Sequence, residues 1–325
     1  MEVKMSRALL AVGIPLVLAL VSRFVFGAEL MATLFSVMSL SFFLLVPYGV
    51  GALTIYLSNI ATVRSLKYRI FMPWVPILGF LALTLLLSWE GWACWMMILP
   101  IFLVFASLGG LTAGYMRLKK SDKTNKLYLS LALLLPFLIA PVERMIGSIP
   151  GFYKAYTYID IAAPKETIWQ NVTRVRQIET HEDHGVLTNF LQIPRPIKAE
   201  LDFEGVGAKR EAIFEGGLIF DERVLQYDHQ KRMTFSITPN THEIPSTTFD
   251  EHILIGGKFF DVLQGTYELE PLSENNFRLH LHSEFKITTT FNFYASIWGR
   301  WIMKDIQQNI LEVIKERSEL TTMDQ

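Results

Sequence analysis

The stretch GVGAKREAIFEGGLIFDERVLQYDHQKRMTFSI, residues 205–237, decides the fold of the second half of this chain. Apolar and polar residues alternate along most of it, as they do in β-strands that bury one face. The sequence Glu215-Gly216-Gly217 interrupts the alternation and indicates a tight hairpin turn. We therefore expect antiparallel strands over 208–214, 218–226 and 232–238.

Helices and further strands are expected on both sides of this stretch. Pro164, followed by Glu166, indicates the start of a helix over 165–177. The chain closes with a long amphipathic helix over 294–317, whose apolar residues form a stripe along one side. Other strand-like runs lie at 154–162, 199–204, 247–255, 262–270 and 276–287.

One face of the expected strands is apolar, whereas the opposite face carries mostly charged residues, threonine and histidine. The apolar set is Leu201, Phe203, Met233, Phe235, Ile237, Leu263, Tyr267, Leu269, Leu279, Leu281 and Phe285. A sheet with one apolar face buries it against another element. We therefore predict an α+β domain over 151–325, in which a curved antiparallel sheet wraps around the C-terminal helix.

The chain has a different character before Pro150, because charged residues there are confined to short breaks between apolar runs. Crossing a bilayer takes about 20 apolar residues. Five runs are predicted to cross, and the last of them is short: 8–26, 30–57, 71–88, 91–116 and 127–142. Residues 1–150 are thus predicted to form a transmembrane helical domain, in a protein of the bacterial inner-membrane type.

Loop charges predict the side of the membrane on which the second domain lies. Lysine and arginine mark cytoplasmic loops. Such residues stand before the first run, between the second and third, and between the fourth and fifth, as Lys4, Arg64 and Arg117 illustrate. Five crossings then place residues 151–325 outside the cytoplasm. If 127–142 does not cross, the same domain is cytoplasmic.

Three segments resemble a known superfamily: YIDIAAPKETIWQNV at 158–172, residues 205–237, and LQGTYELEPLSENNFRLHLHSEFKI at 263–287. Together with the long C-terminal helix, their order is similar to that of the START-like helix-grip superfamily, also called SRPBCC or polyketide cyclase-like. The resemblance covers most of 153–325, and the preceding apolar runs resemble its membrane-anchored branch. It implies a cavity between sheet and helix for a hydrophobic small molecule or lipid. The superfamily includes carriers and enzymes, so the fold does not decide the activity.

Two charged residues interrupt the apolar face, Arg210 and Glu222. A three-residue hairpin loop would place them directly opposite each other, and a register shifted by two would make them diagonal neighbours. The first register would also oppose Glu211 to Asp221 and Lys209 to Arg223, which argues against it. In either register the pair faces an apolar interior. There it would orient a ligand's polar group, tune a carboxylate for acid–base work, or serve as a structural ion pair.

We expect the ligand cavity to be lined by residues from the strands and from the C-terminal helix. The aromatic residues of the helix have plain core packing as their alternative role, since aromatics at helical spacing are usually core. The predicted lining is Arg210, Glu222, Phe220, Phe235, Tyr267, Leu281, Tyr294, Trp298 and Trp301.

Composition and spacing argue against several other classes of function. The net charge of −1, without a basic, aromatic-rich patch, gives no reason to expect nucleic acid. The single cysteine, Cys94, lies in a predicted span, so the second domain holds no disulfide. The acidic and histidine-containing loop at 179–184 matches no strong metal-ligand spacing. We therefore predict neither a metal nor a cofactor.

The sequence favours a non-enzymatic module that binds an apolar or amphipathic molecule beside the bilayer that supplies it. The first alternative is a cyclase- or hydrolase-like enzyme in which Glu222 is the acid or base and Arg210 its partner. The second is a structural or signalling membrane protein whose domain has a filled core.

Overall fold

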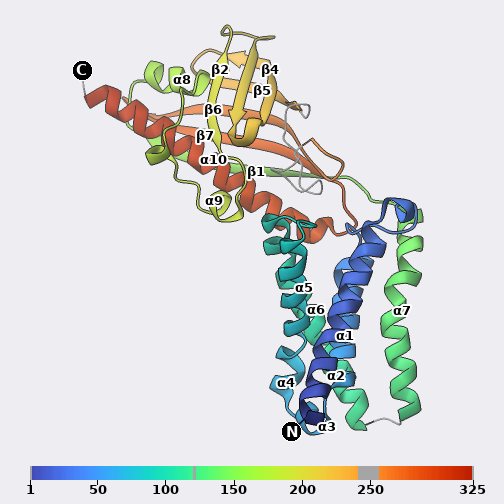
Figure 1. Cartoon of the computed structure of the whole chain (residues 1–325). Helices are drawn as coiled ribbons and strands as arrows, with labels where there is room; N and C mark the ends of the chain where they lie inside the picture. The colour runs from blue at the N-terminus through green and yellow to red at the C-terminus, as the bar shows by residue number, and fades with distance from the viewer. Residues whose placement is uncertain (1, 120–121, 241–255, 324–325) are drawn as a thin grey trace. The chain divides into compact units, whose positions relative to one another are not determined.

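A computed structural model describes residues 2–119, 122–240 and 256–323 (Figure 1). The chain divides into two compact units. The first consists of Met1–Ile149 together with Thr289–Phe291, and the second of Pro150–Thr288 together with Asn292–Gln325. The strand expected over 247–255 lies outside the described residues.

Unit 1 is helical. It contains the helices α1 (Glu2–Gly27), α2 (Val46–Leu57), α3 (Ile60–Val63), α4 (Leu66–Phe71), α5 (Trp74–Leu86), α6 (Trp92–Lys119) and α7 (Asp122–Ile146). A short turn lies at η1 (Glu29–Met31), and a π-helical segment, η2 (Ser41–Leu45), leads directly into α2. In the described part of the chain, four helical segments are long and apolar enough to cross a membrane: Leu9–Gly27, Leu66–Leu86, Trp92–Lys119 and Asp122–Ile146.

The run predicted as a span over 30–57 is shorter than expected, because its continuous helix covers only Ser41–Leu57, 17 residues. Side chains cap the helix at this point. The Ser39 hydroxyl accepts the backbone amide of Phe42, and the Glu143 carboxylate accepts the amides of Leu40 and Ser41. These acceptors satisfy amides that a longer helix would bond internally. By contrast, the run at 127–142, expected to be short, lies within a helix of 25 residues.

Glycine allows α2 and α6 to pack closely. A Cβ atom at Gly51 would overlap with the carbonyl oxygen of Ala106, and one at Gly109 would overlap with that of Tyr48. Small residues of this kind let helix backbones approach in membrane proteins. As a result, α2 is buried along most of its length.

The described residues of unit 2 form a seven-stranded antiparallel sheet in the order β1-β7-β6-β5-β4-β3-β2. Its strands are β1 (Gly151–Ile161), β2 (Pro196–Leu201), β3 (Lys209–Phe214), β4 (Ile219–Asp228), β5 (Arg232–Asn240), β6 (Phe260–Ser273) and β7 (Asn276–Ile287). Its helices are α8 (Lys165–Thr173), α9 (Leu187–Leu191) and α10 (Asn292–Met323), with single turns at η3 (Thr180–Glu182) and η4 (Glu215–Gly217). The sheet curls over α10, which packs against β1 and β7 (Figure 1). This is the predicted helix-grip arrangement.

The core of unit 2 lies on the predicted sheet face, where Ile237 is half-buried against it, with Phe203 and Leu263 as two exceptions. Phe203 is 50% exposed, because β2 ends at Leu201 and the alternation ends with it. Leu263 is only half-buried, because the ladder between β6 and β7 is irregular between Val262 and Gln264. Such an irregularity changes which residue faces inward, and Val262 is buried instead.

Candidate functional site

Arg210 on β3 and Glu222 on β4 are paired directly across the sheet. Arg210 Nη1 lies 2.5 Å from Glu222 Oε2, and both side chains are almost completely buried. The intervening hairpin loop is the three-residue turn Glu215–Gly217, in which Gly216 and Gly217 have φ angles of 69° and 81°. Glycine adopts this left-handed region without strain, so the turn fixes the register that opposes the pair.

The outer-face argument against this register is wrong. Glu211 does lie opposite Asp221, and Lys209 lies opposite Arg223. All four side chains are exposed, so water and salt screen their repulsion. In a register shifted by two, the buried Arg210 and Glu222 would be only diagonal neighbours, roughly 7–8 Å apart. The observed register, which the turn sets, brings the two buried charges into direct contact.

Aromatic residues surround the Arg210 guanidinium. It lies over the Phe235 ring, 5.3 Å from the ring centre, and Tyr267 lines the same cavity wall. Within the described part of the chain, Arg210 Nε has no hydrogen-bond partner, although it is buried. A buried donor without an acceptor costs roughly 1–3 kcal/mol. Arg210 thus has a donor left over after binding Glu222.

Burial shapes the acid–base properties of the site. It raises the pKa of the Glu222 carboxyl above its ordinary value, and the charge of Arg210 opposes that rise. Burial likewise raises the pKa of the Tyr267 hydroxyl. Tyr267 therefore stays protonated at neutral pH, whereas the protonation of Glu222 depends on whether Arg210 remains beside it.

These residues line an open, mainly apolar cavity between the sheet and α10, of about 90 Å³. A second polar group lies in its wall. Gln307 of α10 donates to the Ser283 hydroxyl at 2.8 Å and accepts from Thr157 at 3.2 Å. The full lining is Val175, Ile178, Pro196, Lys198, Ala199, Arg210, Ala212, Phe214, Phe220, Glu222, Phe235, Tyr267, Leu281, Ser283, Met303, Ile306, Gln307 and Ile310.

Six of the nine predicted lining residues, all of them on strands, lie in this wall: Arg210, Phe220, Glu222, Phe235, Tyr267 and Leu281. The predicted helical residues Tyr294, Trp298 and Trp301 are not among the described residues that line it.

The helical periodicity of α10 explains why Trp301 does not line the cavity. Met303 faces the cavity, and Trp301 precedes it by two residues, so about 200° of helical rotation separates them. Trp301 accordingly points outward and is 54% exposed, with its ring against that of Trp298 at 5.4 Å.

Sequence reasoning missed the α10 side of the wall. Gln307, which is buried, is a polar residue between the apolar positions Ile306 and Ile310. A polar residue beside an apolar stripe is the signal that would have indicated a polar contact inside the domain.

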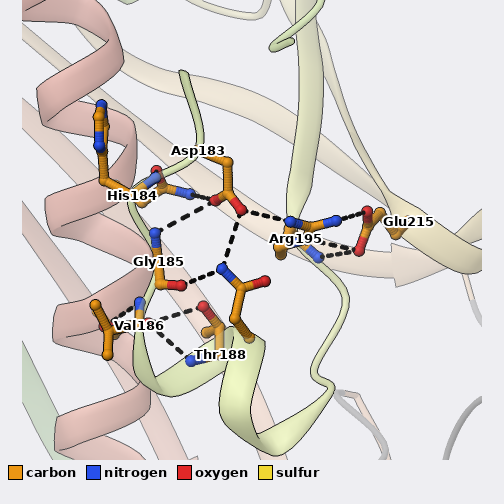
Figure 2. Close-up of polar contacts among 10 residues, drawn as sticks. Asp183, His184, Gly185, Val186, Thr188, Arg195 and Glu215 are labelled. Carbon is orange, nitrogen blue, oxygen red and sulfur yellow. Dashed lines mark hydrogen bonds and ion pairs between the residues drawn. The ribbon is translucent and has the colours of Figure 1, made fainter. Parts of the chain in front are cut away.

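The acidic and histidine-containing loop is a packed structural segment (Figure 2). The Asp183 carboxylate pairs with Arg195, which also binds Glu215 at 2.5 Å. Asp183 further accepts the side-chain amide of Asn309 on α10, at 2.7 Å. His184 lies 3.1 Å from Glu316. Among the described residues no cluster of three or more potential ligands suits a metal ion.

No protein-family model and no curated protein matches the sequence. Among solved structures, the chain is similar to a START superfamily protein from Mycobacterium smegmatis, with 9% identity and a TM-score of 0.36 over 53% of this chain and 99% of that one. It is similar to norcoclaurine synthase from Thalictrum flavum, with 13% identity and a TM-score of 0.32 over 55% of this chain and 91% of that one. It is also similar to a protein from Nitrosospira multiformis, with 16% identity and a TM-score of 0.31 over 53% of this chain and 99% of that one. Likeness at this level carries no argument about activity.

Proposed function

We propose that this protein is a membrane-anchored module that binds an apolar or amphipathic small molecule in the cavity between the sheet and α10. The apolar part of the molecule would contact Phe220, Leu281 and Ile306. Its polar group would lie beside Arg210 and Glu222, as expected for a lipid-like ligand.

The unused donor of Arg210 is the observation that carries this proposal. Arg210 lines the cavity, and among the described residues its buried Nε has no acceptor. Buried polar groups in native proteins are bonded with few exceptions, and an exception in a cavity wall suggests a missing water or ligand. A carbonyl, carboxylate or phosphate oxygen in the cavity would satisfy it.

The size of the cavity limits what it holds in this conformation. Pockets for drug-sized ligands measure roughly 300–1,000 Å³, whereas this cavity measures about 90 Å³. It accommodates a few water molecules or a small fragment. A larger ligand would require Met303 or another flexible lining residue to move.

Native mass spectrometry of the full-length protein, followed by lipid extraction, tests this proposal. We expect a bound apolar species that disappears in Ala212→Phe, which fills the cavity from β3. Leu225→Phe is the matched control, because Leu225 is exposed on the next strand, and it should retain the species. An empty wild-type protein would instead favour a filled core with a structural or signalling role.

A second candidate function is a cyclase- or hydrolase-like activity, which the raised pKa of Glu222 favours. Buried carboxyls with raised pKa values are used as general acids. Glu222→Gln should then abolish turnover and leave ligand binding largely intact. If no bound species is ever converted by the wild-type protein, this candidate fails.

Membrane anchoring, with unit 2 outside the cytoplasm, belongs to the same proposal. Loop charges support this side when Ser41–Leu57 crosses as the fifth helix, because Arg64 precedes α4, Lys67 lies in its first turn, and Arg117 and Lys119 end α6. The test is labelling of Leu225→Cys in a Cys94→Ala background, with a membrane-impermeant maleimide on intact cells. Labelling before lysis is expected, and labelling only after lysis would place unit 2 in the cytoplasm.

A further inference from the structure

The first part of α10 carries a stripe of exposed residues on the side away from the cavity. Phe293, Ile297 and Trp301 follow one another at intervals of four and are 64%, 41% and 54% exposed. Arg300 and Lys304 lie within the same stripe and are also exposed. We call these five residues the exposed α10 face.

The exposed α10 face borders α9, the helix that precedes α10 in the sequence. Asp305, one turn beyond Trp301, accepts the backbone amide of Val186 at 3.2 Å. Val186 precedes α9 and is itself 77% exposed. Single exposed apolar residues are ordinary, but contiguous apolar patches mark interaction sites.

Chain connectivity indicates what covers this face. Phe293 lies two residues after Phe291, so their Cα atoms are at most about 7 Å apart. Phe291 belongs to unit 1, where its ring packs on that of Phe43 at 4.1 Å. Thr290 donates to Glu143, near the end of the candidate span Asp122–Ile146. Since a spanning helix ends at the membrane surface, the exposed α10 face begins close to that surface.

The chemistry of the face fits a lipid surface. Between 292 and 304 the only charged residues are Arg300 and Lys304, and both are basic. Helices that lie in the bilayer interface combine large apolar residues, tryptophan among them, with basic residues. In such helices the aromatic rings lie at headgroup depth, and the basic side chains attract anionic lipids.

We propose that the exposed α10 face binds the surface of an anionic bilayer, with Phe293, Ile297 and Trp301 at headgroup depth and Arg300 and Lys304 beside lipid phosphates. This inference rests on the proposed membrane anchoring but not on ligand binding in the cavity.

Site-directed labelling of the full-length protein tests the inference. In a Cys94→Ala background, Phe293→Cys and Ile297→Cys each receive an environment-sensitive fluorophore, and Leu225→Cys serves as the exposed control on the sheet. The proteins are reconstituted in vesicles of phosphatidylcholine and phosphatidylglycerol. Emission is then quenched either by doxyl-labelled lipids or by aqueous iodide.

We expect the labels at 293 and 297 to be quenched severalfold more strongly by doxyl lipid than the label at 225, with the reverse order for iodide. Arg300→Gln/Lys304→Gln should weaken the lipid quenching. Equal iodide access at all three positions would overturn the inference. Labels shielded from both quenchers would also overturn it, because a protein surface would then cover the face.

Alkaline carbonate extraction of the same vesicles reports anchoring separately. Release of the chain would overturn both the anchoring and this inference. Retention of the chain with iodide-accessible labels would overturn the inference alone.

Discussion

The Asp305 carboxylate on α10 accepts two hydrogen bonds from Thr188, from its backbone amide at 2.8 Å and from its hydroxyl at 2.7 Å. It also accepts the amides of Val186 and Leu187, at 3.2 and 3.1 Å. These amides open α9, where a residue just before the helix would ordinarily cap them. A distant helix therefore caps α9 and fixes the segment between α8 and β2.

Asp305→Ala should loosen this segment. Losing a helix cap costs about 0.5–2 kcal/mol, and the loss should appear as faster hydrogen exchange at the amides of 186–188. Asp221→Ala is the control, because Asp221 is exposed on β4, and it should leave these amides unchanged. Unaltered protection in Asp305→Ala would show that the cap contributes nothing.

Arg210→Met should destabilise unit 2 strongly, because it leaves Glu222 buried without its partner. Such a change costs about 3–5 kcal/mol. The double variant Arg210→Met/Glu222→Leu should recover most of the loss, since it removes both charges. Hydrogen exchange of the β3 and β4 amides in the full-length protein measures this. Equal destabilisation in the single and double variants would contradict the ion-pair account.

Acid should release the segment 179–195, between α8 and β2, from α10 before unit 2 unfolds. Hydrogen bonding from Arg317 lowers the pKa of Glu182 below its ordinary 4.5, and Arg195 lowers that of Glu215 in the same way. A lowered pKa stabilises the folded state above the ordinary value, and this stability is lost as pH falls through the folded-state pKa.

The hydrogen-exchange protection factors at 179–195, each the intrinsic exchange rate at that pH divided by the measured rate, should fall below about pH 4.5. In Glu182→Gln this fall should be smaller, because the amide that replaces the carboxyl group does not titrate. A pH profile identical to that of the wild-type protein would exclude the contact between Glu182 and Arg317 as its cause.

Gly51→Ala should destabilise unit 1, because the added Cβ overlaps with the Ala106 carbonyl. Overpacking of this kind costs about 1–3 kcal/mol. Gly13→Ala is the control, since a Cβ at Gly13 meets no atom within 4 Å, and alanine favours the helix. Thermal unfolding in detergent should separate the two variants in opposite directions, and similar midpoints would contradict the close approach of α2 and α6.

Periodicity predicted much of unit 2. The alternation over 205–237 indicated the strands that became β3, β4 and β5, and it placed Arg210 and Glu222 on the inner face. Predictions from periodicity failed where a local structural feature changed the regular pattern of burial or the start of a helix. Leu263 is displaced by an irregular ladder, and the helix at 41–57 begins late because Glu143, distant in sequence, caps it.

The side of α10 that faces the cavity was harder to predict. Both sides of its first turns are apolar, so a stripe alone does not distinguish Trp301 from Met303. The exposed face becomes recognisable only once the packing of Met303 and Ile306 against the sheet is known. Cavity volume likewise depends on side-chain packing rather than on the pattern of residue types.

The buried pairing of Arg210 with Glu222 has a consequence for inheritance. A change at either position alone leaves one buried charge without its partner, while a joint change to apolar residues is tolerated. Substitutions at positions 210 and 222 are therefore expected to be coupled in evolution. Among diverged descendants of this gene, we expect the two positions to be retained together or replaced together, whereas the exposed pairs Glu211–Asp221 and Lys209–Arg223 vary independently.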